Sequence, residues 1–197
     1  MVSKTLGRII ESMICPLSSI SSEISILIDL IQSNYISVDK NKNDKMNPLP
    51  EKFFLTSGKG LSEISIMNAF DSALVDSGIG ECNIVPVSSI LPEGAEEIEP
   101  IPIEPGTITF TVLSRIHATS GRISAGIGYA LSNKKFGIVA EDNNETEEEV
   151  RVGIQKKLHE MARLRKIKLG KIKIRTESLS IPEGKFGCVL AALVYVF

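Results

Sequence analysis

One stretch organises this chain: Asn83-Ile84-Val85-Pro86-Val87-Ser88-Ser89-Ile90-Leu91-Pro92. Its first five residues are mostly apolar and predict a short buried strand. Two adjacent serines follow, and Pro92 then ends the segment because proline has no backbone N–H for a sheet. The chain has 22 serines and three adjacent pairs of them, about as many as chance gives. Only Ser88-Ser89 stands at the end of a predicted strand.

Composition and charge argue against several classes of protein. A net charge of -2 and an isoelectric point near 5.8 do not fit a nucleic-acid-binding protein, which normally has a basic surface. No apolar run reaches the roughly 20 residues that a membrane-spanning helix needs, so neither nucleic acid nor membrane is predicted as a partner. Three separated cysteines without metal-ligand spacing predict no zinc site and favour a reducing, cytoplasmic compartment.

Residues 1–45 differ from the remainder of the chain. They are rich in serine and isoleucine and end in the polar run 39–45, which reads as a solvated linker. We therefore predict an N-terminal extension over 1–45, disordered or derived from an upstream start site, and a functional domain over 46–197 that begins at Met46. An ordinary helical hairpin packed on the domain is the alternative for 1–45.

The first half of the domain predicts a strand, a turn and a helix. Residues 53–56 are a short strand, and the glycines of 57–60 indicate a turn. An apolar stripe at helical spacing predicts a helix over 62–76, with Ser62 as its N-cap. Gly78 follows where a left-handed C-terminal cap is favoured.

After Pro92 the sequence predicts mainly strands and one further helix. An acidic surface loop spans 93–106, and a helix begins at Thr146, which forms a capping box with Glu149. Apolar and alternating runs predict strands over 107–113, 122–131, 135–141, 171–179 and 186–197. The order of elements indicates two β-α-β-β halves, which would stack as a four-layer α-β-β-α sandwich of the α+β class.

The serine pair permits a specific chemistry. A serine hydroxyl attacks the carbonyl of the preceding residue when the peptide is bent and a donor stabilises the oxyanion. Elimination of the resulting ester cuts the chain, and hydration with loss of ammonia leaves a pyruvoyl group at the new N-terminus. Ser89 would supply that group, Ser88 would become the new C-terminus, and Asn83 is a candidate donor.

Several stretches resemble the pyruvoyl-dependent arginine decarboxylases over about residues 47–197, but not over 1–45. The combination of a helix, a Gly-Ile-Gly turn, a strand and Ser-Ser-Ile-Leu-Pro is far more specific than any of its parts. The stretches that carry the resemblance are Asn68-Ala-Phe-Asp71-Ser-Ala-Leu74, Gly78-Ile-Gly80, Asn83 to Pro92, Ala125-Gly126-Ile127-Gly128 and the strand that ends at Glu141.

The resemblance implies a zymogen that cleaves itself between Ser88 and Ser89. A β chain would end at Ser88, and an α chain would begin with a covalent pyruvoyl group made from Ser89, with no metal and no pyridoxal phosphate. The mature lyase would convert L-arginine to agmatine and CO2 for polyamine biosynthesis. The family also implies a trimer or a dimer of trimers, with active sites between protomers.

The resemblance also implies site residues, at the positions of this chain that match the family's functional residues. Glu141 matches the family's catalytic glutamate, Asp71 its substrate-binding aspartate, and Asn83 an asparagine of processing and the active site. From the residues alone, Glu141 is better interpreted as an ordinary carboxylate at a strand end, and Asp76 and Glu81 are alternatives to Asp71. Two other interpretations stay open: a pyruvoyl decarboxylase of another amino acid, and a non-catalytic trimeric binding protein that is never cleaved.

Overall fold

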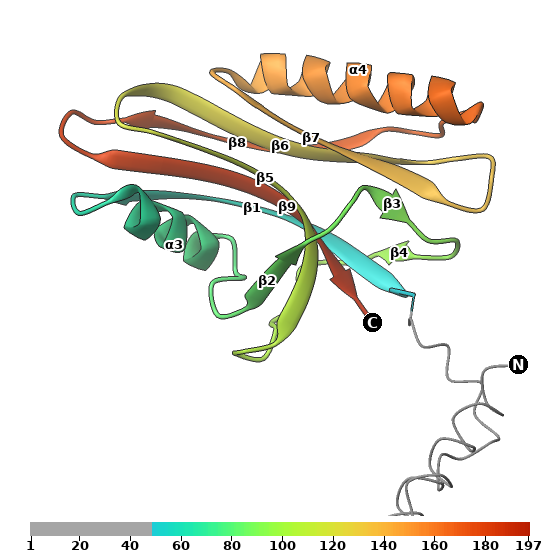
Figure 1. Ribbon diagram of the computed structural model, residues 1–197, viewed down its shortest axis with the longest axis horizontal. Coiled ribbons are helices and arrows are strands. Elements are labelled where there is room, and N and C mark those ends of the chain that lie inside the picture. The colour runs from blue at the N-terminus through green and yellow to red at the C-terminus, as the bar shows by residue number, and fades with distance from the viewer. Residues whose placement is uncertain (1–48) are drawn as a thin grey trace, which may run out of the picture. The chain divides into compact units, whose positions relative to one another are not determined.

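The computed structural model describes residues 49–197; the predictions for residues 1–45 lie outside this part of the chain. The described residues form four layers, helix, sheet, sheet and helix, as Figure 1 shows. The predicted α-β-β-α sandwich is therefore confirmed. Within residues 49–197, neither helix has the length and apolar character needed to cross a membrane.

The first sheet has the strand order β2-β5-β9-β1-β4 and carries α3 (Ile66–Asp76) on its outer face. Strand β9 lies in its middle, between antiparallel β5 and β1, and is buried along most of its length, as the apolar run predicted. The strands of this sheet are β1 (Lys52–Ser62), β2 (Asn83–Pro86), β4 (Glu96–Glu97), β5 (Ile108–Ala118) and β9 (Phe186–Val196).

The second sheet has the order β3-β7-β6-β8 and carries α4 (Glu147–Arg165). Its strands are β3 (Ile90–Leu91), β6 (Gly121–Leu131), β7 (Gly137–Asn144) and β8 (Lys173–Ile181). The capping box of Thr146 and Glu149 is present at the start of α4. Between the sheets lies an apolar core in which Phe53 of β1 meets Tyr129 of β6 edge to face, with ring centroids 5.0 Å apart.

Three local predictions were wrong. The glycines of 57–60 form no turn, because β1 runs straight through them; side chains at Gly58 and Gly60 would overlap the backbone of α3, so their role is close helix packing. The N-cap of α3 is Ser65, whose hydroxyl accepts from the Asn68 N–H at 3.1 Å, and not Ser62. Strand β2 is not buried but is a largely exposed edge strand.

Glycines also allow close helix packing in the second sheet. Gly126 and Gly128 of β6 lie beneath α4: a side chain at Gly126 would collide with Val150 and Ile154, and one at Gly128 would collide with Ile154. Each helix therefore packs closely on a Gly-x-Gly segment of the strand below it. This correspondence supports the pattern of two β-α-β-β halves. The halves exchange one strand each: β3 from the first half pairs in the second sheet, and β9 from the second half pairs in the first sheet.

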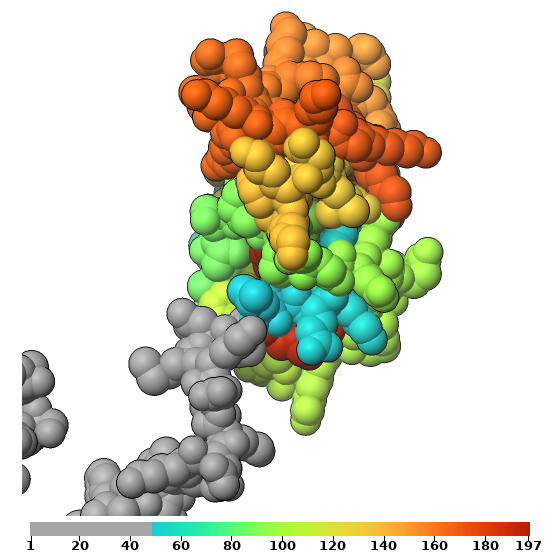
Figure 2. Space-filling model, turned by 90° about the vertical axis from the view of Figure 1, so that its right-hand side faces the viewer, coloured from blue at the N-terminus to red at the C-terminus, as the bar shows by residue number. Residues whose placement is uncertain are grey.

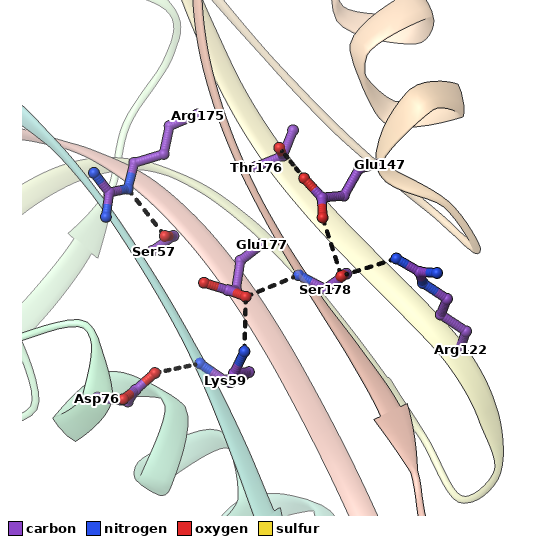
Figure 3. Close-up of polar contacts among 9 residues, drawn as sticks. All are labelled: Ser57, Lys59, Asp76, Arg122, Glu147, Arg175, Thr176, Glu177 and Ser178. Carbon is purple, nitrogen blue, oxygen red and sulfur yellow. Dashed lines mark hydrogen bonds and ion pairs between the residues drawn. The ribbon is translucent and has the colours of Figure 1, made fainter.

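A polar network crosses all four layers at the edge where β1 faces β8 (Figure 3). Asp76 of α3 accepts from the backbone N–H of Lys59 on β1 at 2.9 Å, and the Lys59 ammonium pairs with Glu177 of β8 at 3.1 Å. The hydroxyl of Ser178, next to Glu177, donates to Glu147 of α4 at 3.1 Å. Because these groups are exposed or half-buried at the surface, each pair stabilises the fold by about 1 kcal/mol or less.

Candidate active site

Ser88 and Ser89 lie where the chain leaves one sheet and joins the other. The last backbone hydrogen bond to the first sheet is from the Val87 N–H to the Thr111 carbonyl, at 2.8 Å. The first bond to the second sheet is from the Val139 N–H of β7 to the Ser89 carbonyl, at 3.0 Å. The peptide bond between the two serines therefore spans the step between the layers.

The step is a tight bend that holds the Ser88 carbonyl. The Ile90 N–H donates to the Ser88 oxygen at 3.2 Å, closing a three-residue turn around Ser89. A donor at this oxygen would stabilise the negative charge that forms if a nucleophile attacks the carbonyl. The peptide group that supplies this donor is itself polarised, because its carbonyl accepts from Val139.

Tyr195 of β9 fixes the far side of the bend. Its hydroxyl donates to the Ile90 carbonyl at 2.9 Å. Burial raises the pKa of Tyr195 to about 12, so this hydroxyl keeps its proton at neutral pH and remains a donor. The bend is thus held from both sheets, by β7 through Ser89 and by β9 through Ile90.

Ser89 and Glu141 share one hollow of about 510 Å³. Ser89 is half-buried, as is Glu141. The hollow lies beside the stretch of β7 that β3 leaves without a neighbour, because β3 pairs only with Gly137 and Ile138. Figure 2 views the domain from the end where α4 (orange), the β6–β7 connection (gold) and the green segment with β3 and β4 meet. The full lining is Ser89, Val139, Ala140, Glu141, Lys156, Lys157, Glu160 and Met161.

Ser88 contacts a different hollow, of about 670 Å³. This second hollow is mainly apolar, with Tyr195 and the exposed side chains of Val87, Ile90 and Phe197 among its walls. The two serines therefore face different surroundings. A cut between them would open the chain next to both hollows.

Asn83 and Asp71 do not line either hollow in the single chain. Asn83 begins β2, and its side-chain amide donates to the Gly106 carbonyl at 2.7 Å. Asp71 is exposed on α3, which covers the outer face of the first sheet. The structure thus brings Ser89 and Glu141 together, and it places the other two predicted residues elsewhere.

Sequence reasoning missed three groups at this site: the Ile90 N–H, the Tyr195 hydroxyl and the Lys157 ammonium. The first two act through the geometry of the bend, which no local pattern reveals. No local pattern reveals the third either: Gly153 indicates only that α4 packs closely on another element, because a glycine in the middle of a helix costs about 1 kcal/mol relative to alanine.

Comparison with known proteins identifies the family of this chain. The family model described as pyruvoyl-dependent arginine decarboxylase matches residues 52–197. Relatives named pyruvoyl-dependent arginine decarboxylase include those of Methanopyrus kandleri (36% identity over 148 residues, 75% of this chain and 97% of the relative) and Methanocella arvoryzae (36% over 161 residues, 75% and 96%). A third, from Methanothermobacter thermautotrophicus, is 36% identical over 151 residues (74% and 96%). This chain belongs to the pyruvoyl-dependent arginine decarboxylase family.

Proposed function

We propose that this chain cleaves itself between Ser88 and Ser89 and then decarboxylates L-arginine to agmatine and CO2. The observation that carries the proposal is the position of the serine pair. It lies on the bend between two sheets, and Ser89 lines the same hollow as Glu141, in a chain of a family named for this activity.

Self-cleavage needs the residues of the bend. The Ser89 hydroxyl attacks the Ser88 carbonyl, and the Ile90 N–H stabilises the oxyanion. The C–N bond breaks and an ester to the Ser89 oxygen remains. Loss of the Ser89 α-proton then expels the Ser88 carboxylate, and one water replaces the nitrogen, which leaves as ammonia. The new N-terminus is a pyruvoyl group. Ser89 is half-buried and lines the hollow, which leaves space for this group.

In decarboxylation, the pyruvoyl group supplies the electron sink that pyridoxal phosphate supplies in other enzymes. Glu141 would deliver the proton that replaces CO2 on the substrate α-carbon, because it lines the same hollow as Ser89. We assign no role to a metal or to pyridoxal phosphate.

A second copy of the chain would complete the site. Asp71 is our candidate for pairing with the guanidinium, since a planar carboxylate can accept two parallel hydrogen bonds from it. It is exposed and does not line the hollow of its own chain, so we propose that a neighbouring protomer supplies it. A trimer or a dimer of trimers in the cytoplasm, serving polyamine synthesis, fits this arrangement, and Asn83 is proposed to assist processing.

The test combines intact mass with an arginine-to-agmatine assay on one sample. We expect two fragments, 1–88 and 89–197, the second blocked to Edman chemistry, together with agmatine formation. A single uncleaved chain of 21.4 kDa after long incubation would favour a binding protein. Cleavage without agmatine, and with CO2 released from another amino acid, would indicate a different substrate.

Replacing Asp71 by Asn should raise the KM for arginine by about 10- to 100-fold, because a charge-assisted hydrogen bond contributes about 1.5–3 kcal/mol. Cleavage should be unaffected. Steady-state kinetics measure the change, with Glu148→Gln, which removes an exposed acid of α4, as the matched control. A KM equal to that of the control would remove Asp71 from the substrate site.

A further inference from the structure

Glu141 stands at a point where β7 has no neighbouring strand on one side. In an antiparallel strand, alternate residues direct their backbone groups to the same edge. Since the Val139 N–H bonds to Ser89 at that edge, the backbone groups of Glu141 point to it as well. Strand β3 ends before reaching them, because its two residues pair with Ile138 and Gly137.

Lys157 of α4 bonds to the edge of β7 that no strand within residues 49–197 pairs with at Glu141. Its ammonium donates to the Glu141 carbonyl at 2.7 Å and pairs with the Asp142 carboxylate at 3.0 Å. Lys157 also lines the hollow that Ser89 and Glu141 share. One ammonium group therefore anchors two consecutive residues of β7 to the helix above them.

Helix α4 leaves space for Asp142 beside the Lys157 contact. Asp142 points toward α4, where its carboxylate lies directly over Gly153, one helical turn before Lys157. A side chain at Gly153 would overlap the Asp142 carboxylate. From the other side, the hydroxyl of Ser114 on β5 donates to the Asp142 carbonyl at 2.7 Å. Residues 141 and 142 are thus held by the second sheet, by α4 and by the first sheet.

We infer that Lys157, acting with Asp142 and Gly153, is a positioning residue that fixes Glu141 for proton delivery at the pyruvoyl site. The inference rests on the proposed function. Lys157 acts on the backbone of Glu141, so its loss displaces the carboxyl without removing it. A displacement of about 1 Å at a reacting group can cost up to 100-fold in rate. The loss should therefore appear in kcat, while maturation at the Ser88–Ser89 bend should continue.

The test compares Lys157→Met with Lys59→Met in the full chain. The control pair, Lys59 with Glu177, closely matches Lys157 with Asp142: the lysine side chains are 49% and 51% exposed and the N–O distances are 3.1 and 3.0 Å. We expect Lys157→Met to be fully cleaved, with kcat lowered about 10-fold and KM within about twofold of the wild type. Lys157→Arg should restore most of kcat. Activity of Lys157→Met equal to that of Lys59→Met would overturn the inference.

The Gly153→Ala substitution provides a second, independent test of the inference. Alanine favours the helix, yet its methyl group would push Asp142 aside, so kcat should fall about 10-fold in the wild-type background. In Asp142→Ala the obstacle is gone, and adding Gly153→Ala should change kcat less than twofold. Equal effects in both backgrounds would contradict the proposed contact. A wild-type chain that makes no agmatine would overturn the proposed function itself, together with this inference.

Discussion

Ser89→Ala should leave a single 21.4 kDa chain and no measurable agmatine. Alanine has no hydroxyl to attack the Ser88 carbonyl, so neither the cut nor the pyruvoyl group can form. Both losses should be complete. Intact-mass spectrometry follows the cut, and an agmatine assay on the same sample follows the activity.

The matched control is Ser180→Ala, which removes the hydroxyl of an exposed serine on β8. It should be cleaved and active like the wild type. Agmatine formation by uncleaved Ser89→Ala would refute the mechanism, because decarboxylation would then proceed without a group made from Ser89. Cleavage of this variant at the same bond would show that a different nucleophile attacks.

Glu141→Gln should separate maturation from catalysis. The amide has nearly the same shape as the carboxyl but delivers no proton, and loss of a positioned general acid typically costs 10²- to 10⁴-fold. We therefore expect kcat to fall by about 10²-fold or more while both fragments still appear. Single-turnover kinetics on the fully cleaved protein would measure the chemical step.

Glu183→Gln, at an exposed position between β8 and β9, controls for the loss of one negative charge and should behave like the wild type. An unchanged kcat for Glu141→Gln would remove Glu141 from the proton-delivery role. Failure of this variant to cleave would assign Glu141 to maturation instead.

Local signals in the sequence predicted the elements that local interactions determine. The capping box at Thr146 needs only residues within one helical turn, and it was found. The glycines of 57–60 were misread as a turn because their function depends on α3, which reaches them only in the folded chain. Ser62 and Ser65 are equally good N-caps by type, and the path of the chain after β1 decides between them.

The candidate site was predictable only in part. Ser89 and Glu141 were identified through resemblance to a family, and the structure places them at one hollow. No sequence pattern reveals that Lys157 reaches the carbonyl of Glu141, sixteen residues earlier in the chain, because this contact depends on how α4 lies across β7. The roles of Asp71 and Asn83 stay predictions, since the single chain does not bring them to Ser89.

The position of the Ser88–Ser89 bond, between the two sheets, also determines how reversibly the cleaved protein unfolds. The fragment that ends at Ser88 keeps β1, which pairs over eleven residues with β9 of the other fragment and is covered by α3. Two separate chains would then be interleaved in one sheet, without a covalent link. Unfolding of the mature protein would therefore be a dissociation that depends on protein concentration, and recovery would require two chains to find each other. The uncut chain needs only to fold on itself, so refolding should be efficient before maturation and poor afterwards.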